Sequence, residues 1–114
     1  MEAKAVLRYT KISPRKARQV VDLVRGKDVE QAFNMLQFTP KKAARFVERT
    51  LRSAVANAVN RDEELPVRED ELYVKEAFVD GGIWFKRVRP QPRGAASMVR
   101  KRFSHITLVV SDDV

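Results

Sequence analysis

The sequence predicts an α+β fold with strand segments near both ends of the chain and about three helices between them. Three observations indicate this order. Residues 3–11 alternate between apolar and polar positions, apolar residues recur at helical spacing from 14 to 60, and two strand-like segments follow at 72–80 and 104–110. A length of 114 residues is enough for one domain with a modest core and too short for two. We therefore expect a single domain over residues 1–114.

The first strand is expected at residues 3–11. Side chains of a strand point alternately to its two faces. The face that turns to the core should carry the residues at odd positions, which are Ala3, Ala5, Leu7 and Tyr9.

The first helix has a strong start signal at Ser13 and Pro14, because serine is a preferred N-cap and proline is preferred at the first helical position. Gly26 should end this helix. Its core side is expected to consist of Ala17, Val20, Val21 and Val24.

The opposite side of the first helix is basic and carries Arg15, Lys16, Arg18 and Arg25. Cations near a helix N-terminus oppose the helix dipole, and a bound anion would remove that penalty. The alternative is a basic face that is only solvated.

Two more helices are expected before residue 61. Asp28 and Gln31 have the spacing of a capping box, which predicts a short helix that ends before Thr39. Its inward residues should be Ala32, Phe33 and Leu36. Thr39 and Pro40 repeat the cap-and-proline signal and predict the longest helix, at residues 40–60. Its apolar seam consists of Ala44, Val47, Leu51, Ala54, Val55 and Ala58.

Two further regions are charged, one basic and one acidic, and neither indicates a specific site. The longest helix carries a basic stripe that we take as a secondary contact surface, made of Lys41, Arg45, Arg49 and Arg52. Residues 61–71 hold six carboxylates without a histidine or cysteine. This favours a solvated connection over a metal or acid–base site.

Residues 81–103 are the most distinctive stretch, because they hold seven lysine and arginine residues and no acidic residue. A structureless connection of about twenty residues is uncommon in so small a domain. We therefore expect the two flanking strands to continue as an extended basic β-hairpin arm over residues 81–103. Proline and glycine at residues 90–94 would turn it. An isolated hairpin is marginally stable in water, so we expect this arm to be ordered against a polyanion.

The net charge of +8 is segregated along the chain. Eight basic and two acidic residues give residues 1–27 a charge of +6, while eight basic and eleven acidic residues give residues 28–80 a charge of −3. Seven basic residues give residues 81–111 a charge of +7, and Asp112 and Asp113 give the remaining residues a charge of −2. A basic surface that is concentrated in this way indicates a nucleic-acid partner.

We assign RNA binding to the basic residues of the two charged ends and to one serine. The candidates are Lys11, Ser13, Arg15, Lys16, Arg18, Arg25, Lys27, Lys86, Arg87, Arg89, Arg93, Arg100, Lys101 and Arg102. Trp84 and Phe85 lie among them. These two aromatic residues would either stack on unpaired bases or pack across the strands of the arm.

The sequence offers little for catalysis or metal binding. The absence of cysteine excludes disulfides and thiolate metal sites. His105 is the only histidine, and its place in an expected strand indicates a hydrogen-bonded structural role. Neither Ser13 nor Ser104 lies in a nucleophile motif, so we expect no enzyme activity, no cofactor and no metal.

The chain has no apolar run of membrane-spanning length and no apolar stretch near Met1. We therefore expect a soluble cytoplasmic protein with no membrane partner, monomeric when free.

A series of short motifs runs through nearly the whole chain. They are Ile12-Ser13-Pro14-Arg15-Lys16 with Arg18, Val24-Arg25-Gly26-Lys27, Ser53-Ala54 with Asn57-Ala58, Tyr73-Val74-Lys75-Glu76-Ala77 with Val79-Asp80, Lys86-Arg87 with Pro90 and Gly94, and Lys101-Arg102 with Ser104-His105-Ile106-Thr107. In order and spacing this series resembles the bacterial large-subunit ribosomal protein twenty-two family.

The resemblance implies a small three-stranded antiparallel sheet packed against the helices, with the hairpin protruding from it. Members of the family are structural constituents of the large ribosomal subunit, bind its 23S ribosomal RNA beside neighbouring large-subunit proteins, and aid early assembly. Their hairpin lines the exit tunnel of the nascent peptide, and changes near its tip alter macrolide sensitivity. Carried over by position, the tunnel tip is Lys86, Arg87, Val88, Arg89, Pro90, Gln91, Pro92, Arg93 and Gly94.

The tip departs from the family pattern at three positions, Gln91, Pro92 and Ala95. Gln91 replaces a basic residue, Pro92 a small one, and Ala95 stands where arginine is common. The tip is therefore less charged and stiffer than is usual in the family.

Two other classes of protein remain as alternatives. An architectural DNA-binding protein would insert a basic, proline-tipped arm into the minor groove, normally as a dimer with paired arms. A membrane-surface protein would place its basic residues beside a broad exposed apolar face. The apolar seams of this chain are instead expected to be used by the core.

Overall fold

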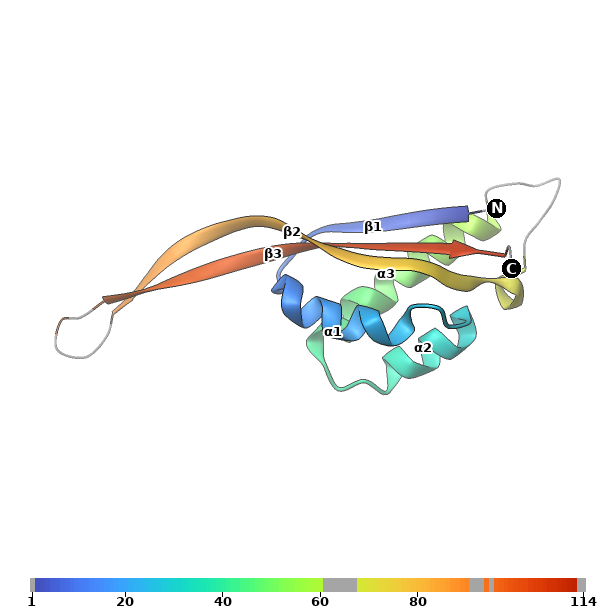
Figure 1. The fold of residues 1–114 in the computed structure, drawn as a ribbon, viewed down its shortest axis with the longest axis horizontal. Helices are drawn as coiled ribbons and strands as arrows, with labels where there is room; N and C mark the ends of the chain where they lie inside the picture. The colour runs from blue at the N-terminus through green and yellow to red at the C-terminus, as the bar shows by residue number, and fades with distance from the viewer. Residues whose placement is uncertain (1, 61–67, 91–93, 95, 113–114) are drawn as a thin grey trace.

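The computed structural model describes residues 2–60, 68–90, 94 and 96–112, with side chains described for 2–60, 68–82, 94 and 102–112. Its elements follow one another as β1 (Glu2–Thr10), α1 (Pro14–Val24), α2 (Val29–Gln37), α3 (Lys42–Val59), the 3₁₀ turn η1 (Glu69–Glu71), β2 (Tyr73–Pro90) and β3 (Ala96–Ser111). Figure 1 shows their arrangement.

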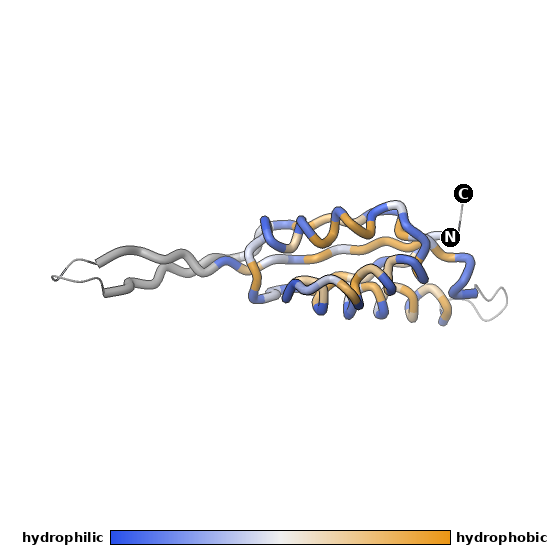
Figure 2. Tube along the Cα trace, turned by 90° about the horizontal axis from the view of Figure 1, so that it is seen from below, coloured by the Kyte–Doolittle hydropathy of each residue, from blue (hydrophilic) through white to orange (hydrophobic). Residues whose placement is uncertain are grey.

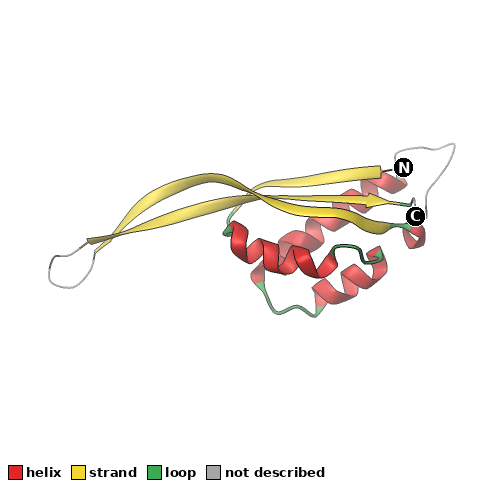
Figure 3. Cartoon of the chain, viewed as in Figure 1, coloured by secondary structure: helices red, strands yellow, loops and turns green. Residues whose placement is uncertain are grey.

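The three strands form one antiparallel sheet in the order β1-β3-β2, so β3 is central and the other two strands are edges. The helices lie against one face of this sheet. Of these, α3 contacts β1 and β3, while α1 contacts β2 (Figure 3). The expected α+β fold with three helices and a three-stranded antiparallel sheet is confirmed.

The core fills the space between the sheet and the helices. Strand residues at alternate positions, such as Ala5, Leu108 and Ala77, are buried against the helices. The expected seams of α1 and α3 are buried as predicted, with Val20, Val47 and Leu51 fully inaccessible to solvent. Each such aliphatic side chain stabilises the fold by about 1.5–3 kcal/mol on burial. Figure 2 shows the hydrophobic stretches gathered in the strands and helices of this body.

Helix α1 starts and ends as the sequence predicts. Ser13 is its N-cap, and the Ser13 hydroxyl accepts a long hydrogen bond of 3.4 Å from the backbone N–H of Lys16. Gly26 follows the helix with φ of +79°, a left-handed conformation that glycine adopts without strain.

The capping box expected at the start of α2 is wrong, although Asp28 does occupy the N-cap position. Its side chain makes no capping hydrogen bond. The backbone on either side of Asp28 is bound elsewhere: Lys27 pairs with Val74 of β2, Val29 pairs with Leu72 directly before β2, and Asp28 itself forms a bridge with Tyr73.

The start of α3 differs from the prediction in a similar way. The helix begins at Lys42 rather than at residue 40, and its N-cap is Lys41. The Thr39 hydroxyl donates to the carbonyl oxygen of Met35 at 2.6 Å. Thr39 therefore satisfies the C-terminal end of α2 instead of capping α3.

The expected core face of β1 is correct at Ala3, Ala5 and Leu7 and wrong at Tyr9. The pairing of β1 with β3 is irregular between Leu7 and Thr10, and Tyr9 has φ of +56°. This irregularity changes the alternation of side chains, so Thr10 is buried and Tyr9 is exposed.

Strands β2 and β3 pair well beyond the end of β1, as far as Pro90 and Ala96. In Figure 1 this two-stranded ribbon projects from the body, and the molecule measures 67 × 25 × 17 Å along its principal axes. The pairing is compatible with the arm expected at residues 81–103. Residues 91–93 and 95 of the expected tip lie outside the described residues.

Candidate RNA-binding surface

The start of α1 lies at the base of the projecting ribbon. A Cβ atom placed on Gly81 of β2 would lie 4.0 Å from Cγ of Pro14, so the first turn of α1 is next to the point where β2 leaves the body. Lys11, Arg15 and Lys16 are exposed there, and the first turn of α1 contains no acidic residue. The structure thus brings basic residues from the N-terminal region to the foot of the basic arm.

Two of the predicted RNA-binding residues, Arg18 on α1 and Arg25 directly after it, have protein partners. The guanidinium of Arg18 donates through Nε and Nη2 to the carbonyl oxygen of Val79, at 3.3 and 2.9 Å. Arg25 makes the same forked contact with the carbonyl oxygen of Ala77, at 3.1 and 2.6 Å, and its Nη1 lies 2.9 Å from Asp22. Both arginines therefore bind the backbone of the edge strand β2.

The loop between α1 and α2 covers the earlier part of the same edge. Gly26 N–H donates to Val74 O at 2.9 Å, Val74 N–H donates to Lys27 O at 2.9 Å, and Val29 N–H donates to Leu72 O at 3.1 Å. A register shift between Val74 and Glu76 changes which residues point outward. The outward carbonyls that follow are those of Ala77 and Val79, and these are the two that the arginines bind.

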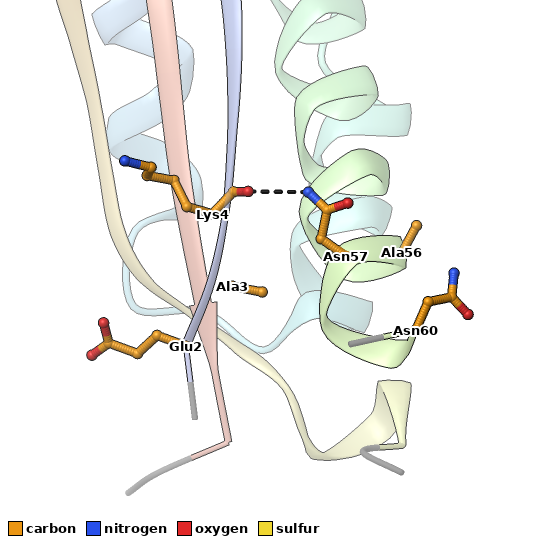
Figure 4. A pocket seen from close by; sticks show the side chains of 6 residues that line it. All are labelled: Glu2, Ala3, Lys4, Ala56, Asn57 and Asn60. Carbon is orange, nitrogen blue, oxygen red and sulfur yellow. Dashed lines mark hydrogen bonds between the residues drawn. The ribbon is translucent and has the colours of Figure 1, made fainter. Parts of the chain in front are cut away.

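The other sheet edge, β1, receives a matching contact from α3. The Asn57 side chain donates to the carbonyl oxygen of Lys4 at 3.1 Å, as Figure 4 shows. This contact adjoins a surface pocket of about 480 Å³ between β1 and α3. In Figure 4 the ammonium of Lys4 and the carboxylate of Glu2 point away from α3, so the pocket does not gather charged groups.

An ion pair also links two strands on the open face of the sheet. The Lys75 ammonium on β2 donates to the Glu2 carboxylate on β1, across the central strand. This hydrogen bond and the negative charge of Glu2 raise the pKa of Lys75. Lys75 is thereby committed to Glu2 and is a poor candidate for RNA contact.

The structure describes the side chains of only some of the remaining predicted RNA-binding residues. Lys27 and Arg102 are exposed, and Ser13 is partly buried in its capping role. The structure does not describe the side chains of the other basic candidates, which are Lys86, Arg87, Arg89, Arg100 and Lys101, or any part of Arg93. The side chains of Trp84 and Phe85 are likewise not described. Their RNA contacts stay predictions.

His105 has the hydrogen-bonded role expected of it, with a partner that the sequence did not suggest. Its Nδ1 accepts from the backbone N–H of Tyr9 at 3.2 Å, and the two rings meet edge to face with centroids 4.9 Å apart. Tyr9 was expected in the core, so its contact with the partly buried His105 was missed. The one signal in the sequence for this contact is that an aromatic residue, Tyr9, stands close before Lys11 and the basic first helix.

No other chemistry emerges from the side chains that the structure describes. Within that part of the chain, no group of three or more His, Cys, Asp or Glu residues is placed to hold a metal ion. Among the helices described, none has the length and apolarity to cross a membrane.

Residues 5–111 match the family model described as Ribosomal protein L22p/L17e. The chain belongs to this ribosomal protein family. It is 53% identical to the large ribosomal subunit protein uL22 of Carboxydothermus hydrogenoformans over 112 residues, which cover 98% of this chain and 96% of the relative. The uL22 protein of Thermus thermophilus is 54% identical with the same coverage. A relative from a Thermotoga species is 53% identical, and the match covers 69% of its length.

Membership of the L22p/L17e family agrees with the resemblance drawn from the motifs. The matched range includes the three helices, all of β2 and β3, and most of β1. The family consists of structural ribosomal proteins rather than enzymes.

Proposed function

We propose that this chain is a structural constituent of the large ribosomal subunit, in the cytoplasmic ribosome, and that it binds large-subunit ribosomal RNA beside neighbouring ribosomal proteins. The observation that carries this proposal is the junction between α1 and the ribbon. There the exposed Lys11, Arg15 and Lys16 adjoin the base of a segment that carries seven further basic residues. Basic residues of the body beside a basic segment of the chain suit a phosphate backbone.

We propose fewer RNA-binding residues than the sequence alone suggested. Phosphates would be bound by those predicted residues that are exposed and have no protein partner in the described structure, and by the cations of the arm. These are Lys11, Arg15, Lys16, Lys27, Lys86, Arg87, Arg89, Arg93, Arg100, Lys101 and Arg102. Arg18 and Arg25 instead attach α1 to β2, and Ser13 acts by capping α1.

The arm over residues 81–103 is proposed to reach the exit tunnel and to present its tip, Lys86 to Gly94, to the nascent peptide. Eight or nine residues per strand reach about 25–30 Å at roughly 3.3 Å per residue. That length separates the tip from the phosphate contacts of the body. In this arrangement the body supplies most of the affinity, early assembly depends on the body, and the tip shapes the tunnel wall.

The RNA-binding part is tested by comparing three anionic partners at equal salt. The full chain is titrated with protein-free large-subunit ribosomal RNA, with duplex DNA and with vesicles that contain an anionic lipid. We expect the ribosomal RNA to bind most tightly, with affinity that falls steeply with salt. Equal binding to duplex DNA, together with a dimer in sedimentation, would favour the architectural DNA-binding class, since we expect the free chain to be monomeric.

The tunnel part is tested by deleting Lys86, Arg87 and Val88 in ribosomes. Removing three residues from one strand reverses the side-chain faces beyond the deletion, so the tip is displaced rather than only shortened. We expect normal incorporation into the subunit with an altered macrolide response and altered stalling of some nascent peptides. Failed assembly, with unchanged tunnel behaviour in the surviving ribosomes, would instead identify the arm as an RNA clamp.

A further inference from the structure

A strained residue lies at the foot of the arm. Tyr9 has φ of +56°, a left-handed conformation that is uncommon for residues other than glycine, asparagine and aspartate. Among the residues that the structure describes, it is the one non-glycine residue with positive φ. Such conformations persist only where the surrounding structure imposes them, and they concentrate at functional sites.

Contacts from the other two strands hold Tyr9 in this conformation. Its backbone N–H donates to Nδ1 of His105 on β3 at 3.2 Å, and its ring meets the imidazole at 84°. The imidazole is itself confined by β2, because a Cβ on Gly82 would approach His105 Nε2 and Phe103 O to 3.1 Å. The pair is therefore built into the sheet at the point where the arm begins.

The segment after Tyr9 is equally fixed. Ile12 is buried, its N–H donates to Thr10 O at 2.8 Å, and its carbonyl oxygen accepts from the buried hydroxyl of Ser104 at 2.6 Å. This anchoring sets the position of Lys11, which is exposed between the two buried residues. Tyr9 and Lys11 are thus presented from one rigid stretch of backbone.

The Tyr9 side chain gains little from this arrangement within the protein, since 58% of its surface is exposed. The exposed charges nearby in the sequence are Arg8, Lys11, Arg15 and Lys16, and the residue paired with His105 on β2 is the exposed Asp80. An exposed aromatic ring in a stretch of sequence that holds several exposed cations suits single-stranded nucleic acid, which binds by base stacking and phosphate contacts together. The single carboxylate of Asp80, on the strand beyond His105, does not outweigh the positive charge of these four residues.

We propose that Tyr9, held in place by His105, is a stacking platform for one unpaired nucleobase of the large-subunit ribosomal RNA. The phosphates that flank this base would meet Lys11 and Lys16. The inference rests on the proposed RNA-binding function and adds a base contact to a surface otherwise made of phosphate contacts. It requires the RNA to be unpaired at that point, because a base inside a duplex has no free face.

The test uses the full chain and protein-free large-subunit ribosomal RNA. Affinity is measured for the wild type, Tyr9→Phe, Tyr9→Leu and Tyr9→Gly, with chemical probing of base accessibility in each complex. Leucine and glycine should lower affinity about 5- to 150-fold, which corresponds to the ~1–3 kcal/mol contributed by a stacked base. They should leave the salt dependence unchanged, because no cation is removed. Phenylalanine should bind as the wild type does.

Two controls separate stacking from folding. Tyr9→Gly should melt no lower than the wild type, because glycine adopts φ of +56° without strain. Phe38→Leu alters a side chain that is 80% exposed without positive φ, and this variant should bind like the wild type. In the probing, an unpaired base that is protected by the wild type should become reactive in the leucine and glycine variants.

Wild-type affinity in Tyr9→Leu and Tyr9→Gly would overturn the platform and leave the proposed function standing. So would an affinity loss confined to variants that also melt lower, because Tyr9 would then act only on folding. A wild-type chain that does not bind the ribosomal RNA would instead overturn the proposed function, and the platform with it.

Discussion

At the residue scale, cations on the same helix have different roles. Arg15 and Lys16 are exposed near the start of α1, while Arg18 and Arg25 each place a guanidinium fork on a carbonyl of β2. A helical pattern of basic residues does not distinguish the two pairs. The distinction depends on which side chains reach the outward carbonyls of an edge strand.

The exposed pair should govern salt dependence. The double variant Arg15→Ala, Lys16→Ala should flatten the log–log salt slope of RNA binding by about 1.4 units, at roughly 0.7 per phosphate contact. Thermal stability should not fall, because neither side chain has a described protein partner and the cations oppose the helix dipole. The backbone N–H of Lys16, which Ser13 caps, is kept in the variant. Binding isotherms at several salt concentrations measure the slope, and a slope equal to that of the wild type would mean that this face is only solvated.

The two arginines that bind β2, Arg18 and Arg25, should instead affect the stability of the fold. Arg25→Ala removes both bonds to Ala77 O and the contact with Asp22. For so accessible a side chain we expect a loss of about 1–2 kcal/mol in the free energy of unfolding. Lysine cannot supply the fork, so Arg25→Lys should recover only part of the loss. Denaturant unfolding measures this, with the exposed Arg49→Ala on α3 as the matched control. A variant as stable as that control would show that the clamp contributes nothing.

A buried hydroxyl offers a sharper stability test. Ser104 is inaccessible to solvent, and its hydroxyl donates to Ile12 O at 2.6 Å. Ser104→Ala leaves that carbonyl without this donor and should cost about 1–3 kcal/mol. The exposed Ser53→Ala on α3 should be nearly neutral. Equal melting temperatures for the two variants would contradict the role given to this bond.

At the element scale, the described core belongs to the body. The buried apolar residues that the structure describes lie in β1, the helices and the parts of β2 and β3 within the sheet. Replacing residues 83–99 by an Asn-Gly turn should therefore leave a chain that unfolds cooperatively. Circular dichroism during heating tests this expectation. Loss of a cooperative transition would mean that the arm is part of the folding unit.

The sequence predicts the elements better than their junctions. Ser13, Pro14 and Gly26 mark the two ends of α1 correctly, because the signals are local. Thr39 carries an equally strong local signal, yet its hydroxyl binds the end of α2, and local sequence cannot tell which helix end a hydroxyl will satisfy. Tyr9 was misplaced because a bulge depends on pairing with β3, almost a hundred residues later in the chain.

At the scale of the whole molecule, both edges of the sheet within the body have contacts from other elements of the same chain. Arg18, Arg25 and the α1–α2 loop occupy the edge of β2, and Asn57 binds the edge of β1. Covering edges in this way opposes strand addition by a second copy. The body therefore offers basic side chains rather than open backbone at its surface, which suits the RNA binding that we propose.

We propose above all that the basic surface of this chain holds it in the large ribosomal subunit. The most direct test of this proposal is sedimentation of ribosomes that contain a tagged copy of the full chain, after dissociation into subunits and a high-salt wash. We predict that the tagged wild-type chain stays with the large subunit. The Arg15→Ala, Lys16→Ala variant should leave it at lower salt than the wild-type chain does. Release of the wild-type chain to the top of the gradient, or its recovery with the small subunit, would contradict the account.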